Sequence, residues 1–96
     1  MNITTTVDGS TTTIALEGWL DTNTSPELGA ALQNLDESCE SLVLDLANLE
    51  YISSAGLRVL VSAHKQMKGN LTIRNVSAEV MQVLHMAGFD RRLHIE

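Results

Sequence analysis

The most informative stretch of the chain runs from Leu46 to Leu60 and reads Leu-Ala-Asn-Leu-Glu-Tyr-Ile-Ser-Ser-Ala-Gly-Leu-Arg-Val-Leu. It places two hydroxyls, those of Ser53 and Ser54, where a strand and loop pass into a helix. A helix start carries unpaired backbone N–H groups and a partial positive charge, so an anion added to a capping serine is stabilised there. The stretch therefore predicts a switch rather than a catalyst.

The residues before this stretch predict a β-hairpin followed by a helix. Ile3–Val7 and Thr11–Glu17 are Thr-rich, β-branched runs, and the Asp8-Gly9 dipeptide between them favours a two-residue hairpin turn. Thr24 is followed three residues later by a glutamate, which is the spacing of a capping box. We expect a helix from there to about Asp36.

The remaining elements are predicted from hydrophobic spacing. The short apolar run Leu42–Leu46 is typical of a strand in the middle of a sheet. Apolar residues with helical spacing follow from Ser54, which we expect to cap that helix. In chain order, we then expect the helix to run from Ser54 to about Met67, a strand at Leu71–Arg74, a helix from a Ser77 cap to Ala87, and an edge strand at Leu93–Ile95.

The element order is therefore β-β-α-β-α-β-α-β. Helices that connect consecutive strands favour parallel pairing through right-handed crossovers. The sequence predicts an α/β domain over residues 1–96, with a mixed, mostly parallel sheet, an N-terminal hairpin and helices packed on the sheet. At 96 residues the chain is too short for a substrate domain beside a cofactor domain.

Charge and composition narrow the choice of partner. Twelve acidic and six basic residues give a net charge of −6, and only Arg91 and Arg92 are adjacent cations, so a nucleic acid would be repelled. A basic or neutral protein partner is favoured. The single Cys39 allows no internal disulfide, and no signal peptide or bilayer-length apolar run is visible, which predicts a cytoplasmic protein without direct membrane insertion.

Two motifs resemble the STAS domain of bacterial anti-sigma-factor antagonists, and the resemblance covers essentially the whole chain. They are Gly18-Trp19-Leu20-Asp21, which is weak alone, and Leu49–Leu57, which is fairly specific. The resemblance implies that Ser54 matches the phosphorylated serine of the family. Gly56 and Leu57 match its Gly-Leu pair, and Asp21 matches an acidic residue of its first motif.

Two departures from the family pattern bear on function. Ser53 stands where the family has an aspartate, and Trp19 stands where it has a glutamate. The chain thus lacks two acidic groups that the resemblance places near the partner. Ser53 also becomes a second or competing candidate for phosphorylation.

The resemblance implies a non-enzymatic, phosphorylation-switched regulator of sigma-factor-dependent transcription. Unphosphorylated, it would bind a serine-kinase anti-sigma factor; phosphorylated on Ser54, it would release that factor. The kinase would supply ATP and Mg²⁺, a serine/threonine protein phosphatase would reverse the mark, and the domain itself would hold no cofactor or metal. The expected contact surface consists of Asp21, Thr22, Asn23, Ser53, Ser54, Gly56, Leu57 and Arg58.

Other interpretations stay open at this point. One alternative is that Ser54 is an ordinary helix cap and that Gly56 relieves crowding against the preceding strand. Similar domains are constitutive docking subunits of membrane transport or lipid-trafficking ABC complexes, a role that needs no phosphorylatable serine. Asp21 has no neighbouring His or carboxylate for hydrolase or metal chemistry, and the three histidines are expected to pack or to face solvent. An edge strand at Leu93–Ile95 allows a monomer or a weak dimer.

Overall fold

Five strands with alternating apolar residues build one sheet. A computed structural model describes all of residues 1–96, and its strands lie in the sheet in chain order. β1 pairs antiparallel with β2, and every other neighbouring pair is parallel, which confirms the predicted mixed sheet and its N-terminal hairpin. The strands are β1 (Asn2–Asp8), β2 (Thr11–Leu20), β3 (Ser41–Ile52), β4 (Leu71–Arg74) and β5 (His94–Ile95).

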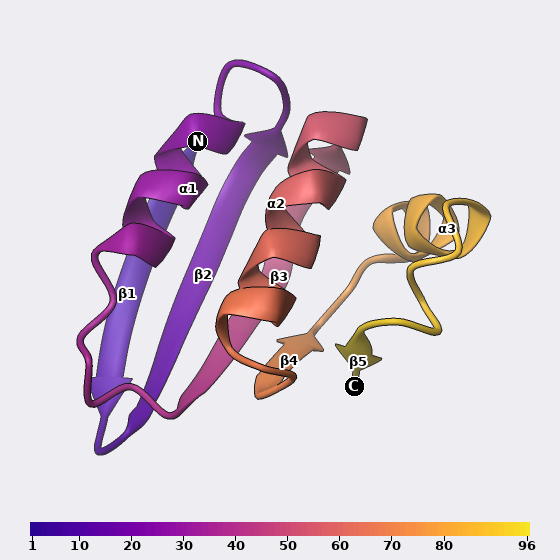
Figure 1. Ribbon diagram of the computed structural model, residues 1–96. Coiled ribbons are helices and arrows are strands. Elements are labelled where there is room, and N and C mark those ends of the chain that lie inside the picture. Colours follow the sequence, from indigo (N-terminus) through magenta and orange to yellow (C-terminus); the bar gives the residue numbers. More distant parts are fainter.

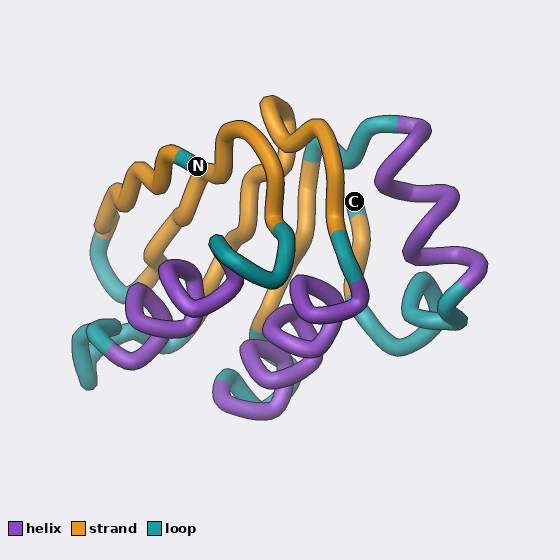
Figure 2. The backbone as a smooth tube through the Cα atoms, turned by 90° about the horizontal axis from the view of Figure 1, so that it is seen from above, coloured by secondary structure: helices purple, strands orange, loops and turns teal.

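Three helices complete the predicted element order. They are α1 (Ser25–Gln33), α2 (Ser54–Gln66) and α3 (Ala78–Met86). α1 and α2 pack side by side on one face of the sheet, α3 lies at the β5 side, and the other face of the sheet carries no helix (Figures 1 and 2). The common face of α1 and α2 follows from right-handed crossovers between parallel strands that are added in one direction. α3 lies further along the sheet and contacts β3.

The hairpin turn lies one residue later than predicted. Asp8 pairs with Thr11, so the two turn residues are Gly9 and Ser10, not Asp8 and Gly9. Gly9 has φ = 62°, a backbone conformation that glycine adopts without steric cost. The threonines on either side form the expected strands.

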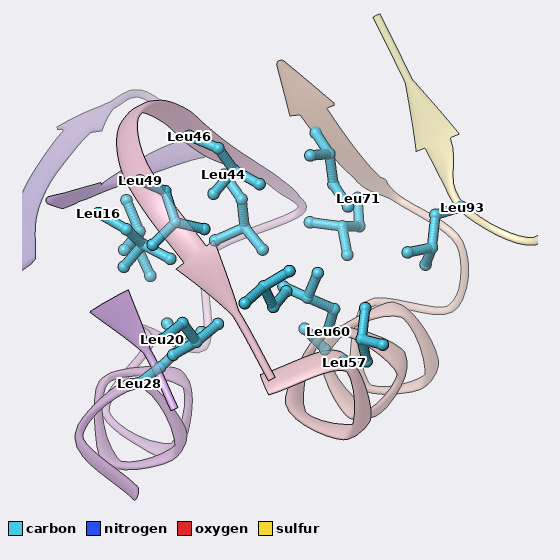
Figure 3. Close-up of a cluster of buried hydrophobic side chains, with 14 of the residues drawn as sticks. Leu16, Leu20, Leu28, Leu44, Leu46, Leu49, Leu57, Leu60, Leu71 and Leu93 are labelled. Atoms are coloured by element: carbon cyan, nitrogen blue, oxygen red, sulfur yellow. The ribbon is translucent and has the colours of Figure 1, made fainter. Parts of the chain in front are cut away.

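The core lies between the sheet and the helices and is built mainly from leucine. Figure 3 shows Leu44 and Leu46 of β3 facing Leu57 and Leu60 of α2, with Leu20 beside Leu28 of α1. Burying one such side chain contributes about 1.5–3 kcal/mol. These contacts hold the starts of α1 and α2 against the ends of β2 and β3.

β3 is longer than the predicted Leu42–Leu46 strand, and two bulges interrupt the alternation in the part that was not predicted. Its register against β2 shifts between Ala15 and Glu17 and again between Gly18 and Trp19, and each shift gives β3 one extra residue. After Leu46, the inward side chains therefore recur every three residues instead of every two, at Leu49 and Ile52. Strict alternation breaks down, but the strand continues to the start of α2.

Candidate functional site

The candidate site lies where β2 and β3 end and α1 and α2 begin. The two strands are parallel neighbours, so their carboxyl ends reach the same edge of the sheet, at the top of Figure 1. The Ser53 N–H donates a hydrogen bond of 2.8 Å to the Leu20 carbonyl. This bond joins the end of β3 to the end of β2 and brings the predicted residues around Asp21 and Ser54 to one edge.

Ser53, and not Ser54, caps α2. Ser53 has extended backbone angles of φ = −95° and ψ = 174°, and its Oγ accepts the Gly56 N–H at 3.2 Å. The prediction that Ser54 is the capping residue is therefore wrong by one position. The cap falls on Ser53 because the chain stays extended there, and Ser54 already has its place in the first helical turn.

Ser54 is exposed, and its hydroxyl makes no hydrogen bond within the chain. The first-turn N–H groups of Gly56 and Leu57 are taken up by the Ser53 side chain and carbonyl, whereas those of Ser54 and Ala55 have no partner in the chain. These two free donors add to the positive end of the helix dipole. An anion attached to the Ser54 hydroxyl would meet a favourable local potential without displacing the cap.

Gly56 and Leu57 lie beneath this surface. A Cβ atom on Gly56 would stand 2.8 Å from Leu20 Cγ and 2.9 Å from Ile52 Cγ1, and Leu57 is only 7 % exposed. Both residues of the expected contact surface are therefore buried in the unbound chain, and their contact with a partner stays a prediction. The crowding interpretation of Gly56 holds, because only glycine lets the first turn of α2 pack so closely on the strand ends.

The loop before α1 is fixed by its own side chains. Asp21 Oδ1 accepts the N–H groups of Asn23 at 2.9 Å and Thr24 at 3.0 Å, and these hydrogen bonds, that from Thr24 first, hold the pKa of Asp21 below its ordinary value. Thr24 Oγ1 accepts the Asp21 N–H at 2.8 Å and donates to the Trp19 carbonyl at 2.7 Å. The Asp21 carboxylate is thus engaged in an Asx-type turn.

The predicted capping box at Thr24 does not form. Thr24 occupies the N-cap position, but its side chain makes no capping hydrogen bond to α1 and points back into the loop. Asp21 supplies the hydrogen-bonding oxygen instead, and the buried Ser25 hydroxyl donates to the Asp21 carbonyl. The spacing to Glu27 was a correct signal for a helix start but a wrong one for the atoms that stabilise it.

The other predicted contact residues lie at the surface of the same edge. Thr22 and Asn23 are exposed at the tip of the loop, and Arg58 is exposed one turn along α2 from Ser54. Arg58 forms no ion pair; the cationic partners in the three salt bridges of the chain are Arg74, His85 and His94. Its guanidinium is available to a partner or to a charge on Ser54.

One feature of this edge was not predicted from the sequence. Trp19 and Tyr51 lie opposite each other on β2 and β3, with ring centroids 5.3 Å apart. The bulge at Glu50 brings them together, since without the extra residue Tyr51 would not face Trp19. The sequence contained only an indirect signal, two large aromatic residues close to the ends of neighbouring strands.

The histidines lie apart from this edge, as expected of packing and surface residues. His85 and His94 are exposed, and His64 is half-buried on α2. No group of three or more His, Cys, Asp or Glu side chains is placed to hold a metal ion. None of the helices combines the length and the apolar character needed to cross a bilayer.

Comparison with known proteins identifies the family. The family model described as "Mlab, STAS domain" matches residues 3–95. The chain belongs to the STAS domain family. This STAS domain is 36 % identical over 78 residues to a protein of Bordetella bronchiseptica named putative anti-sigma factor antagonist BtrV, with 77 % of this chain and 67 % of the relative covered.

Further comparisons place the STAS domain among the anti-sigma-factor antagonists, which are non-enzymatic regulatory proteins. It is 33 % identical over 82 residues to the anti-sigma F factor antagonist of Paenibacillus polymyxa, with 78 % of this chain and 68 % of that protein covered. The crystal structure of an anti-sigma factor antagonist from Mycobacterium paratuberculosis has the same fold. It matches with a TM-score of 0.88 at 20 % identity, over 98 % of this chain and 83 % of that one.

Proposed function

We propose that this STAS domain is a partner-switching regulator that binds a serine-kinase anti-sigma factor and is released when Ser54 is phosphorylated. Binding would free a sigma factor and so promote the transcription that this sigma factor directs. A serine/threonine protein phosphatase would restore the binding form. The single observation that carries the proposal is the free, exposed hydroxyl of Ser54, set in the first turn of α2 beside two unpaired N–H groups.

The hydrogen bonds of α2 favour Ser54 over Ser53 as the phosphate acceptor. The Ser53 hydroxyl is half-buried and holds the Gly56 N–H, so modifying it would disturb the cap. Such a cap contributes about 1 kcal/mol to helix stability. Ser54 can be modified without that loss, and a kinase can reach its hydroxyl from solvent.

The charge of a phosphate is large enough for a binary switch. Phosphoserine carries about −1.5 to −2 charges at neutral pH. Two like unit charges about 4 Å apart repel by about 4 kcal/mol at an effective dielectric constant near 20. Because about 1.4 kcal/mol is tenfold in affinity, a phosphate that faces a carboxylate or an apolar group of the partner would weaken binding about 10- to 1000-fold.

The same phosphate should leave the fold intact. The start of α2 offsets an added negative charge by about 0.3–2 kcal/mol, since the free N–H groups and the dipole both favour an anion there. Arg58, one turn further along, can approach the phosphate at the i+4 spacing. The modification would therefore change what the surface binds and not how the chain folds.

The assignment of Ser54 as the phosphate acceptor is tested by incubating the protein with ATP and the purified anti-sigma kinase of the host. We expect wild type, Ser53→Ala and Ser62→Ala to take up phosphate from ATP, and Ser54→Ala to take up none while it still binds the kinase. Ser62 is an exposed serine on the same helix and is the matched control. Incorporation by Ser54→Ala equal to that of wild type would exclude Ser54 as the acceptor.

A constitutive docking subunit of a membrane transport or lipid-trafficking ABC complex would behave differently. Its partner in a pull-down would be a nucleotide-binding transporter subunit, and neither Ser54→Ala nor Ser54→Asp would alter that association. Recovery of a small kinase whose binding depends on the charge at position 54 distinguishes the two functions.

A further inference from the structure

An exposed aromatic pair lies beside the proposed contact surface. Trp19 is 56 % exposed and Tyr51 is 45 % exposed, and their ring planes are tilted by 46° at a centroid separation of 5.3 Å. The chain has only three aromatic residues of the Phe, Tyr and Trp types, and two of them stand together at the surface. Each could have contributed a large apolar area to the core, so their joint exposure calls for a partner.

The pair is held on rigid strands and faces away from the helices. Leu20 and Ile52, the next residues of β2 and β3, are fully buried on the helix side, so Trp19 and Tyr51 point to the helix-free face. Rings fixed on paired strands lose little conformational freedom when a partner binds. This is the usual setting of a residue that dominates an interface.

Two carboxylates without ion-pair partners flank the rings. Glu17 precedes Trp19 by two residues on the same face of β2, and Glu50 is the bulged residue before Tyr51. Both are exposed and neither takes part in any of the three salt bridges of the chain; Glu17 accepts one hydrogen bond, of 3.1 Å, from the side-chain amide of Asn2. Both also line one shallow hollow of about 610 Å³ together with Asn48, and the two rings are not part of its lining.

Aromatic faces and carboxylates that form no salt bridge together favour a cation. A guanidinium stacks on a Trp or Tyr ring and at the same time donates to carboxylates in its plane, whereas a lysine ammonium makes only point contacts. The net charge of −6 adds a long-range attraction for a basic segment.

This aromatic pair is continuous with the proposed contact surface. Tyr51 lies three residues before Ser54, so their Cα atoms are at most about 11 Å apart. Trp19 lies two residues before Asp21, and its carbonyl accepts the Thr24 hydroxyl at 2.7 Å. A standard interface covers about 800 Å² on each partner, which is wide enough to include both the rings and Ser54.

We infer that the interface with the partner kinase extends onto the helix-free face of the sheet, where Trp19 and Tyr51 receive an arginine-bearing segment of the kinase. Its guanidinium stacks on the rings and pairs with Glu17 and Glu50. The identity of the partner rests on the proposed function. The cation pocket that we infer, formed by the two rings and the two carboxylates, does not depend on it. Trp19 and Tyr51 supply affinity and partner choice, and Ser54 supplies the switch.

A defined peptide tests the pocket without the kinase. Acetyl-Leu-Arg-Leu-amide, added at millimolar concentration, should produce saturable NMR shifts at the Trp19 indole N–H and the Tyr51 ring. The analogue with citrulline in place of arginine has the same shape without the charge and should produce none. Equal shifts from both peptides, shifts spread evenly over the surface, or no saturable shift at all would overturn the inference.

Affinity for the kinase tests the pocket in its proposed context. We expect Trp19→Thr and Tyr51→Thr each to weaken binding by about 10-fold or more, as hot-spot residues do, and Tyr51→Phe to bind as wild type does. Glu50→Gln should weaken binding by about 2- to 5-fold, with the loss disappearing at high salt. Met86→Thr and Glu79→Gln are matched controls, because both residues are exposed on α3, and they should bind unchanged.

The outcomes separate the two proposals. If the kinase binds wild type, Trp19→Thr and Tyr51→Thr equally well, the extended interface is wrong and the proposed function stands. If no kinase modifies Ser54, the proposed function is wrong, and the arginine and citrulline peptides still decide whether the pocket takes a cation.

Discussion

The starts of α1 and α2 lie side by side at one edge of the sheet, yet they use their polar side chains in opposite ways. Before α1, the side chains of Asp21, Thr24 and Ser25 are all engaged in hydrogen bonds within the loop. Before α2, Ser53 alone provides the cap and the next hydroxyl, that of Ser54, stays free. One helix start is thus a fixed support, and the other offers a group that can be modified without loss of structure.

The largest expected difference between the two helices comes from their glycines. Gly56→Leu should lower the free energy of unfolding by about 3 kcal/mol, because even a Cβ there would overlap Leu20 and Ile52. Gly29→Ala on α1 should raise it by about 0.5–1 kcal/mol, since nothing lies within 4 Å of its Cβ position and alanine favours a helix. Urea denaturation measures both, and a Gly56→Leu variant as stable as wild type would contradict the close packing.

The next effect concerns the loop before α1. Thr24→Val keeps the shape of the side chain but leaves the Asp21 N–H and the Trp19 carbonyl without their partner, so we expect a loss of about 2 kcal/mol. Thr22→Val, at the exposed tip of the same loop, should stay within about 0.5 kcal/mol of wild type. Equal stability of the two variants in urea would mean that the Thr24 hydroxyl does not hold the loop.

A smaller effect separates the two serines of α2. Ser53→Ala should lower the free energy of unfolding by about 1 kcal/mol through loss of the cap. Ser54→Ala should change it by less than about 0.5 kcal/mol, because the hydroxyl is exposed and unbonded. The reverse order in thermal or urea unfolding would show that Ser54 caps the helix after all.

The smallest effect is acid sensitivity of the α1 loop. Hydrogen bonds from Thr24 and Asn23 lower the pKa of Asp21 in the folded state, so their stabilisation is fully present above the ordinary aspartate pKa and is lost as the pH falls through the lower folded value. The protection of the Asn23 and Thr24 amides, which compares their exchange rate with the intrinsic rate at the same pH, should therefore fall below pH 3.8, the ordinary aspartate pKa. The first turn of α2, which has no carboxylate cap, should show no such step.

The sequence was sufficient for the layout of the fold because its apolar spacing is locally consistent. Leu71–Arg74 forms the predicted strand, and α2 runs from Ser54 to Gln66, one residue short of the expected end near Met67. The full length of β3 could not be predicted, because its two bulges shift Leu49 and Ile52 out of the period-2 alternation that identifies a strand.

The site was predictable in place but not in atomic detail. The resemblance predicted that Ser54 and the Asp21 loop lie close together, and the fold places both at one edge of the sheet. Which hydroxyl caps α2 depends on whether the backbone at Ser53 stays extended, as it does here with its N–H bonded to the Leu20 carbonyl, and a sequence alone does not show that contact. The pairing of Trp19 with Tyr51 depends on a bulge, which leaves no clear mark in a single sequence.

The central claim is that a charge on Ser54 changes binding and leaves the fold unchanged. It is tested most directly by measuring the affinity of the purified anti-sigma kinase for the unphosphorylated protein and for protein phosphorylated on Ser54, with circular dichroism and urea unfolding of both forms. We predict that phosphorylation weakens binding about 10- to 1000-fold while the two unfolding curves coincide within about 1 kcal/mol. Equal affinity of the two forms, or loss of binding that follows only from unfolding, would contradict the account.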